Sequence, residues 1–172
     1  MNIPIEEIIN FHIKRTNCHV QTLNYFAQIL GYHFPEHDSD KYKEPYIFGY
    51  AYCNYAKHHK NCVMLPQQKE IFAKVHEEHH KMQPHHIEHY TSMQDISNIA
   101  LTEMLCDWHS ANFEQNFITN ENEFSSISDF FQKEMSKLDW SKKQLEYINM
   151  VIEKISTTSN YEEIKQIWEA LN

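Results

Sequence analysis

Glycine is scarce in this chain, which has two glycines in 172 residues. Leu, Ile, Glu and Lys are plentiful instead, and this combination favours helices joined by short connections. The length fits one domain with enough residues to bury a core. We therefore expect a single all-α domain, with the fold class of a helical bundle.

Basic residues are also in deficit, since 15 Lys and Arg stand against 24 Asp and Glu and the formal net charge is −9. Binding to a nucleic-acid backbone needs a cationic surface that neutralises phosphates, so we expect no such partner. A small anionic substrate could still be held locally by a metal and a few cations. The balance of charge therefore leaves small phosphorylated molecules open as substrates.

The chain has few cysteines and no long apolar run. Its four cysteines, Cys18, Cys53, Cys62 and Cys106, form no CxxC pair and have none of the usual zinc-finger spacings. No segment is apolar enough to span a bilayer, and the first thirty residues carry charges where a signal peptide would have its apolar stretch. We expect a reduced, cytoplasmic setting without disulfides and without membrane contact.

A long amphipathic helix is predicted from Pro4 to Leu30, with Gly31 closing it. Two histidines, His12 and His19, interrupt its apolar stripe and point inward. For either one, a core histidine satisfied by a hydrogen bond is the alternative to a metal ligand. The inward positions are Ile5, Ile8, Ile9, His12, Thr16, His19, Leu23, Ala27 and Leu30.

The segment that follows contains an adjacent histidine and aspartate, His37 and Asp38. A neutral imidazole beside a carboxylate offers a divalent metal one nitrogen and one oxygen. Pro35 can start a helical turn that places Lys41 beside both groups. Asp40 is expected to be solvated in this arrangement.

A second histidine cluster surrounds a proline. Pro66 opens a helix whose inward stripe includes His79, and Pro84 breaks that helix just before His85 and His86. The number of histidines in the chain, thirteen, does not explain why these three lie on the apolar side and at the break. This is the most specific local pattern in the sequence.

The next helix reaches His109 and is expected to be capped by Ser92 or Asp95. Two carboxylates four residues apart, Glu103 and Asp107, lie on its apolar face. Burying an ionised carboxylate is expensive unless a cation, a metal or hydrogen bonds compensate. We interpret Asp107 as a metal ligand and Glu103 as a group that orients a ligand or moves a proton.

Taken in order, these residues read H, HD, H, HH, D, with Lys41 completing the motif HD-x-x-K. This pattern resembles the HD-domain superfamily of metal-dependent phosphohydrolases, particularly two-metal branches such as the HD-GYP domains. It is more similar still to small uncharacterised HD-like proteins of bacteria and phages. These share HD-x-x-K, a His shortly before Pro-His-His, and a later E-M-x-C-D-W. The likeness covers about the first two thirds of the chain.

The resemblance implies a bundle of the HD-domain type around one or two divalent transition-metal ions, with Mn, Fe, Co, Ni and Zn not distinguished. If two ions are present, Asp38 should bridge them. The spacing of this superfamily favours His19 over His12 as the first metal ligand. His12 is then either the alternative ligand or a residue that supports the ligands without contacting the metal. Either His85 or His86 could face inward. The implied ligands are His19, His37, Asp38, His79, His85, His86 and Asp107.

The function implied by the resemblance is hydrolysis of a phosphate ester, plausibly a nucleotide-like small molecule, by metal-activated water. Lys41 would hold the substrate phosphate, with Arg15 as a weaker candidate, and Asp38, Lys41 and Glu103 form the expected catalytic set. Two alternatives stay open. One is an HD-type diiron oxygenase, and the other is a non-catalytic domain that a metal stabilises.

The aromatic segment between Pro45 and Ala56 is expected to pack in the core rather than to stack a nucleotide. Gly49 within it suggests close packing against a neighbouring element. The run of residues 57–61, which contains His58, is expected to be an exposed helix end without a metal.

The single domain, residues 1–172, divides by expected role into a metal-site core at 1–110, a loop at 111–126 and scaffold helices at 127–172. The loop is polar and rich in Asn. The scaffold carries apolar stripes without inward polar groups and could serve as the surface of a homo-oligomer. Its expected helices are Ile127–Leu138, Ser141–Ile155 and Tyr161–Leu171.

Overall fold

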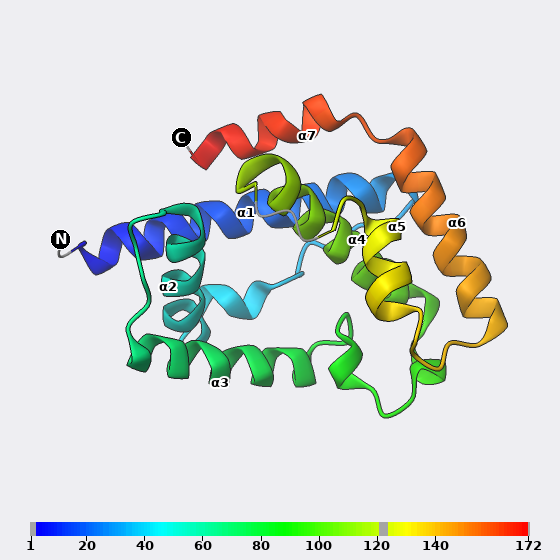
Figure 1. Cartoon of the computed structure of the whole chain (residues 1–172), viewed down its shortest axis with the longest axis horizontal. Coiled ribbons are helices and arrows are strands. Elements are labelled where there is room, and N and C mark those ends of the chain that lie inside the picture. Colours follow the sequence, from blue (N-terminus) through cyan, green and yellow to red (C-terminus); the bar gives the residue numbers. More distant parts are fainter. Residues whose placement is uncertain (1–2, 121–123, 172) are drawn as a thin grey trace.

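The structure is a computed structural model that describes residues 3–120 and 124–171. All regular secondary structure in these residues is helical, which confirms the all-α prediction (Figure 1). None of the described helices has the length and apolar character needed to cross a membrane. The α-helices are α1 (Ile5–Ile29), α2 (Tyr46–His58), α3 (Pro66–Met82), α4 (Asn98–Phe113), α5 (Ile127–Phe130), α6 (Lys142–Thr158) and α7 (Tyr161–Trp168).

Shorter helical turns connect these elements. Four are 3₁₀ helices, and two are π-helical turns that directly continue an α-helix. Such π turns often occur at functional sites. The 3₁₀ helices are η1 (Ser39–Tyr42), η2 (Ile87–His89), η3 (Met93–Asp95) and η6 (Glu169–Leu171), and the π turns are η4 (Glu114–Ile118) and η5 (Phe131–Met135).

Helix α1 lies at the centre of the molecule and packs against α2, α4, α6 and α7 (Figure 1). It ends where the sequence predicts, because Gly31 adopts a positive φ of 82° just after the helix. Helices α2 and α3 pack against each other beside the first half of α1, while α6 and α7 contact its second half. The middle of α1 is therefore covered from several sides.

Close packing of α2 on α3 depends on Gly49. A Cβ atom at this position would lie 2.5 Å from Val75 Cγ2 and 3.3 Å from Phe72 Cα. Tyr50 and Tyr55, on the same helix, are buried. The expectation of close approach at the glycine is therefore confirmed. Core packing is confirmed for Tyr50 and Tyr55, whereas the other aromatics of the segment, Tyr46, Phe48 and Tyr52, are only half-buried.

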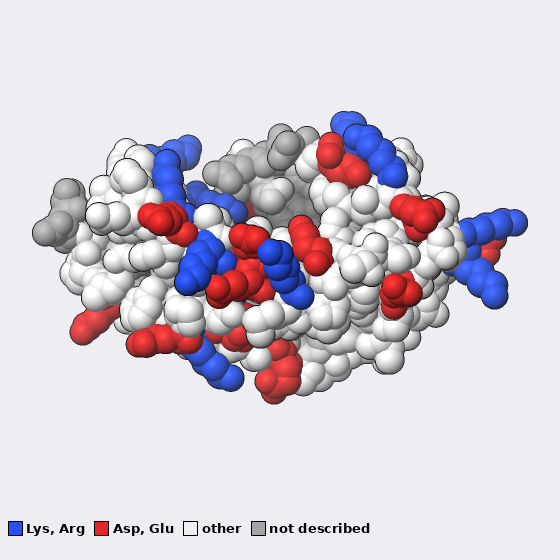
Figure 2. Space-filling view, turned by 90° about the horizontal axis from the view of Figure 1, so that it is seen from below, with Lys and Arg blue, Asp and Glu red and all other residues white. Residues whose placement is uncertain are grey.

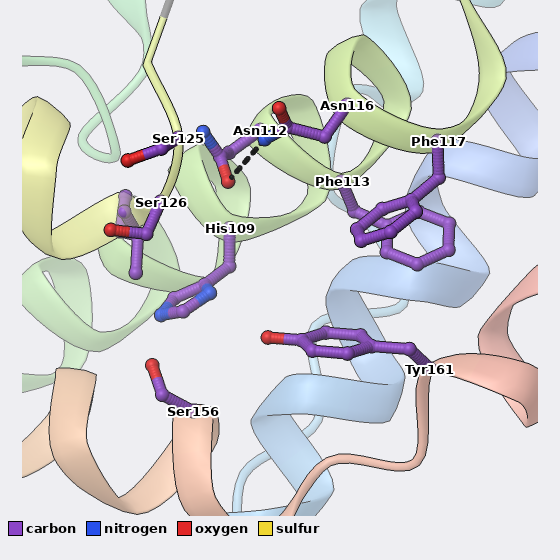
Figure 3. A pocket seen from close by; sticks show the side chains of 10 residues that line it. His109, Asn112, Phe113, Asn116, Phe117, Ser125, Ser126, Ser156 and Tyr161 are labelled. Atoms are coloured by element: carbon purple, nitrogen blue, oxygen red, sulfur yellow. Dashed lines mark hydrogen bonds between the residues drawn. The ribbon is translucent and has the colours of Figure 1, made fainter. Parts of the chain in front are cut away.

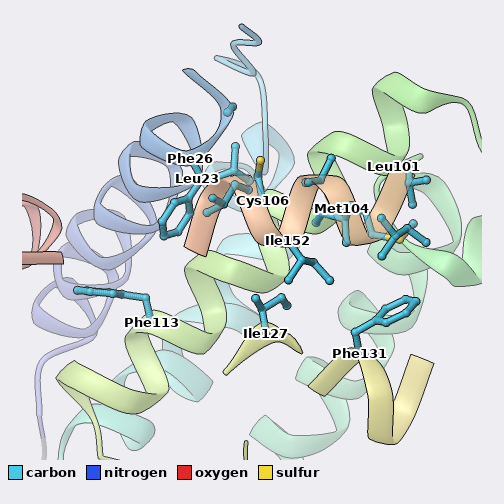
Figure 4. Close-up of a cluster of buried hydrophobic side chains, with 14 of the residues drawn as sticks. Leu23, Phe26, Leu101, Met104, Cys106, Phe113, Ile127, Phe131 and Ile152 are labelled. Carbon is cyan, nitrogen blue, oxygen red and sulfur yellow. The ribbon is translucent and has the colours of Figure 1, made fainter. Parts of the chain in front are cut away.

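The main apolar core lies between the second half of α1 and helices α4 to α7 (Figure 4). Leu23 and Phe26 of α1 meet Leu101 and Met104 of α4, and each of these side chains has an exposed fraction of 0%. One buried polar group, Gln144 of α6, corrects the expectation of a purely apolar scaffold. Its amide donates hydrogen bonds to main-chain carbonyls that precede α4.

Helix α4 begins later and ends later than predicted. Its cap is Ser97, whose Oγ accepts the amide of Ala100 at 3.2 Å, while Ser92 caps only the short η3. The helix continues to Phe113 and then into the π turn η4, so the first part of the predicted loop at 111–126 is helical. The loop prediction was wrong for residues 111–118, where the helical periodicity of α4 persists.

The C-terminal helices also differ in length from the prediction. The expected Ile127–Leu138 helix is a short α5 followed by η5, which ends at Met135. Helix α6 runs past Ile155 to Thr158, and α7 ends at Trp168 before a 3₁₀ turn.

Figure 2 shows one face of the molecule, on which acidic and basic side chains alternate across the middle.

Candidate metal centre

The seven predicted ligands come together beside the middle of α1. They form two triads, and within each triad one ligand atom per residue lies within 4.8 Å of the others. Asp38 lies between the triads. The first triad is His19, His37 and Asp107, and the second triad is His79, His85 and His86.

The two carboxylate oxygens of Asp38 face different triads. Its Oδ2 lies 3.9 Å from His19 Nε2 and 3.7 Å from His37 Nε2. Its Oδ1 lies 3.2 Å from His79 Nε2 and 3.8 Å from His85 Nε2. Asp38 is thus placed as a ligand shared by two adjacent groups of donors.

Local backbone geometry aims this carboxylate. Asp38 has a φ of 59° and adopts the left-handed conformation at the start of η1. This conformation is uncommon for residues other than glycine and is tolerated best by Asn and Asp. Residues held in it cluster at functional sites, where the surrounding structure maintains them. The predicted turn is present, although His37 and Asp38 precede the 3₁₀ helix rather than lying within it.

Three of the five proposed ligand histidines have a hydrogen-bond partner on Nδ1. His37 Nδ1 lies 2.9 Å from Glu103 Oε1, His79 Nδ1 lies 2.7 Å from Asp40 Oδ2, and His19 Nδ1 lies 3.0 Å from Ser110 Oγ. Metal-ligating histidines commonly donate the other ring N–H in this way, which directs the Nε2 lone pair towards the metal. The partners are the acidic or hydroxyl groups Glu103, Asp40 and Ser110.

For His19 the tautomer follows from the contacts. The hydroxyl of Ser110 donates to the carbonyl of His19 at 3.0 Å, so it accepts the Nδ1–H of the same residue. Nε2 of His19 then carries a lone pair when the ring is neutral. Since this atom lies 2.9 Å from Asp107 Oδ1, a proton or a cation between the two acceptor atoms is needed to hold them at this distance. Burial lowers the pKa of His19, which favours the neutral ring that a metal requires.

Several proposed ligand atoms are buried without a hydrogen-bond partner among the described residues. Each such atom costs about 1–3 kcal/mol relative to a satisfied one. Cations held by the two triads would pair these atoms, so the residues present fit a metal. The unpaired ligand atoms are Nε2 of His37, His79, His85 and His86, and Oδ1 of Asp38.

The carboxylates make this region favourable for positive charge. Burial alone would lower the pKa of His37, but Asp38, Asp107 and Glu103 outweigh it and raise the pKa to about 10. Burial alone would raise the pKa of Asp38, but Lys41 and His37 hold it well below its usual range. A proton or a metal ion can therefore supply the charge that the cluster favours.

Both members of the Pro-His-His sequence turn towards the centre. His85 and His86 have exposed fractions of 2% and 9%, and both belong to the second triad. The ring of His86 stacks on His80, with centroids 3.8 Å apart. The sequence left open which of the two faces inward, and the structure makes both available.

Lys41 and His12 are linked to the centre in different ways. Lys41 Nζ lies 2.8 Å from Asp38 Oδ2 and 4.6 Å from the centroid of the Tyr50 ring. His12 Nε2 donates to the carbonyl of Lys41 at 2.9 Å, and its Nδ1 accepts from Asn54. His12 therefore has both nitrogens engaged and supports the turn that carries Lys41.

Asp40 corrects the expectation of a solvated side chain. Its Oδ2 accepts the Nδ1–H of His79 at 2.7 Å, and its side chain is 20% exposed. The sequence does show that Asp40 lies two residues after Asp38. Its role as a partner of His79 cannot be inferred from that spacing, because it depends on α3 placing His79 next to the turn.

Arg15 pairs with an acidic side chain of the protein. Its guanidinium forms a pair of hydrogen bonds with the buried carboxylate of Glu114, in the π turn η4. The same carboxylate lies 2.8 Å from Nε2 of His58, whose side chain is 8% exposed. Arg15 is thus paired within the protein, and its weaker candidacy as a substrate contact stays a prediction. His58 ends α2 as expected, but it is buried rather than exposed. Glu114 follows Asp107 by seven residues, so continuing the helical periodicity would have identified it.

Comparison with known proteins matches residues 7–158 to the family described as Family of unknown function (DUF5662). The chain therefore belongs to this family. No curated protein and no solved structure matches the chain. The resemblance to HD-domain proteins stays a prediction from the sequence motif.

Proposed function

For this member of the DUF5662 family, we propose a metal-dependent phosphohydrolase that acts on a phosphate ester, with a small nucleotide-like molecule as substrate. One observation carries the proposal. The two oxygens of Asp38 each face a separate triad of ligands, an arrangement suited to two metal ions that share one carboxylate. Two-metal sites of this kind are common among enzymes that displace groups at phosphorus.

The donor set supports transition-metal binding. Imidazole nitrogens together with carboxylate oxygens suit Zn, Fe, Ni and related ions, and they include no soft thiolate. Bound there, divalent metal ions supply positive charge for a phosphoryl group and lower the pKa of a coordinated water towards neutrality. The protein contributes the fixed geometry, because Glu103 and Asp40 hold His37 and His79 in place.

Lys41 is the cation proposed to position the phosphate. It follows the His-Asp pair at the spacing of the HD-x-x-K motif, and its ammonium lies beside the shared carboxylate. Its main chain is supported by His12, which fixes the direction of the turn. A cation held in this place can neutralise charge that develops on phosphate oxygens during attack.

The test is turnover of a phosphomonoester and phosphodiester panel by protein purified without nickel affinity, after metal analysis and reconstitution. Asp38→Asn keeps the side-chain shape but removes the charge of the shared ligand, so metal affinity should fall and turnover should nearly vanish. Asp95→Asn, at an exposed aspartate, is the matched control and should behave like the parent. Turnover that persists in metal-depleted Asp38→Asn protein would contradict the proposal.

Lys41→Met separates the role of the cation from that of the ligands. It leaves all seven ligands in place, so metal content and melting temperature should stay near the parent values. Turnover should fall through loss of transition-state stabilisation worth on the order of 2–4 kcal/mol. Lys43→Met, at an exposed lysine two residues further on, should keep full turnover. Full activity in Lys41→Met would remove Lys41 from the mechanism.

Two outcomes would contradict the proposed phosphohydrolase function and favour another function. Iron as the bound metal, together with an oxidised-diiron absorption band and oxygen uptake, would support an oxygenase. No turnover of any ester, with a melting temperature that falls sharply when metal is removed, would support a metal-stabilised structural domain. Metal analysis and the ester panel therefore discriminate the three functions.

A further inference from the structure

A second site, a partly open cavity, lies on another side of α4, away from the candidate metal centre. Its walls are α4 and η4 on one side, and the segment that leads into α5, the end of α6 and the start of α7 on the others (Figure 3). Its volume is about 230 Å³. It is lined by His109, Asn112, Phe113, Asn116, Phe117, Ser125, Ser126, Ile127, Ser156 and Tyr161.

The imidazole of His109 is the central feature of this cavity. The residue is 4% exposed, and its Nε2 is buried without a hydrogen-bond partner among the described residues. Figure 3 shows the ring between Ser126, Ser156 and Tyr161. Buried side-chain nitrogens are normally satisfied, so an unpaired one in a cavity wall indicates a missing partner inside the cavity.

The cavity is separate from the metal centre although both use α4. Asp107 points to His19 of α1, at 2.9 Å, whereas His109, two residues further on, packs against Phe26 and lines the second cavity. Residues two apart on an α-helix lie on nearly opposite faces. None of the seven proposed metal ligands lines the cavity.

The remaining lining combines amides and hydroxyls with aromatic rings. Asn116 Nδ2 donates to Asn112 Oδ1 at 3.0 Å, and both amide groups donate to the carbonyl of Phe124, so their orientation is fixed. The ring of Tyr161 lies against Phe117, with centroids 5.6 Å apart. The lining contains no Lys, Arg, Asp or Glu. Such a wall suits a neutral ligand that has a flat face and a hydrogen-bonding edge.

We propose that this cavity binds a small uncharged heterocycle of the nucleobase type. Ligand pockets usually span about 300–1,000 Å³, and this cavity lies just below that range, so it accommodates a single base but not a nucleotide with its ribose and phosphates. The edge of a base carries hydrogen-bond donors and acceptors, and His109 Nε2 and the hydroxyl of Ser156 face the cavity as their partners. The amides of Asn112 and Asn116 are bonded to each other and to Phe124, so they shape the wall of the cavity rather than contact the ligand edge.

The test is calorimetric titration of the full chain with adenine, cytosine and uracil, and with ribose as a non-aromatic comparison. At least one base should bind saturably with one site per chain. His109→Phe keeps a flat ring but removes the nitrogen, and Ser156→Leu fills the cavity from an exposed position on α6. Each variant should weaken binding tenfold or more. Thr157→Leu, at the next residue on the same helix and outside the lining, should leave it unchanged.

Three results would overturn the proposal. The first is that none of the three bases binds saturably, which would mean that the cavity holds only water. The second is that ribose binds in place of the bases, which would assign the cavity to polyols. The third is that a base binds but the Ser156→Leu variant binds it as tightly as the parent does. Since Ser156 is exposed, this last variant remains informative even if His109→Phe fails to fold.

Discussion

The candidate metal centre and the main apolar core both use α1 and α4, and the centre adds His79 of α3 and the segments that contain His37–Asp38 and His85–His86. The two regions satisfy their buried atoms differently. In the core, Leu23 and Leu101 are fully buried among other apolar side chains. In the centre, His79 and Asp38 are as deeply buried, yet some of their polar atoms have no hydrogen-bond partner among the described residues. The core pairs its buried atoms within the protein, whereas the centre leaves buried polar atoms that a bound cation could pair.

This difference indicates which region carries function. Buried apolar contacts stabilise a fold without any ligand, while a cluster of buried, unpaired polar atoms destabilises it by roughly 1–3 kcal/mol for each atom. Natural sequences depart from good local packing mainly at functional sites. The left-handed backbone of Asp38, in the middle of the cluster, is a departure of the same kind.

The largest expected effect concerns Arg15 and Glu114, the buried pair beside the centre. Glu114→Gln leaves the guanidinium buried without its counter-charge and should lower the free energy of unfolding by about 3–5 kcal/mol. Urea unfolding of parent and variant measures this loss. A loss below about 1 kcal/mol would show that the pair is screened like a surface ion pair.

The same pair predicts a pH dependence. Burial alone would raise the pKa of Glu114, but Arg15 and His58 hold it below its usual value of 4.5. A depressed carboxyl pKa contributes stability that is present above the unfolded-state value and is lost as pH falls through the folded-state value. The difference between parent and Glu114→Gln should therefore stay constant from about pH 7 to 5 and shrink below about 4.5. An unchanged difference in acid would contradict this assignment.

A truncation in the apolar core should be insensitive to metal. Leu101→Ala removes a side chain with no exposed surface and should cost about 2–5 kcal/mol. The loss should be the same with bound metal and with chelator, because Leu101 contacts the core rather than the ligands. A variant that also loses metal would show that the two regions are coupled through α4.

The smallest effect concerns the start of α4, the helix that both regions share. Ser97→Ala removes the cap of a long helix and should cost about 1 kcal/mol. Ser92→Ala removes the cap of the three-residue η3 and should cost less. Thermal unfolding of the two variants measures the difference, and the reverse order would restore Ser92 as the cap of the main helix.

The sequence predicted those parts of the fold that local chemistry decides. Gly31 and Pro66 mark helix boundaries because one permits a positive φ and the other suits a first helical turn. The start of α4 was misplaced because Ser92 and Ser97 are both good caps, and only tertiary packing selects between them. The π turn η4 was missed because its polar composition resembles that of a loop.

In the candidate site, the ligands could be predicted but several of their partners could not. Inward position and the HD-like order predicted from sequence alone that His19 and Asp107 share a site, and the structure places His19 Nε2 2.9 Å from Asp107 Oδ1. The pairing of His79 with Asp40, and of Arg15 with Glu114, joins residues far apart in the chain. Such contacts depend on how α1, α3 and α4 pack, which periodicity within one helix does not reveal.

The most direct test of the two-metal centre is the number of metal ions bound per chain, measured by elemental analysis after reconstitution and removal of excess metal. The parent should bind two ions. A His79→Ala, His86→Ala double variant removes two ligands of the second triad and should retain one, while Asp38→Asn should weaken both sites. One ion per chain in the parent, unchanged in the double variant, would contradict the account of Asp38 as a ligand shared by two metals.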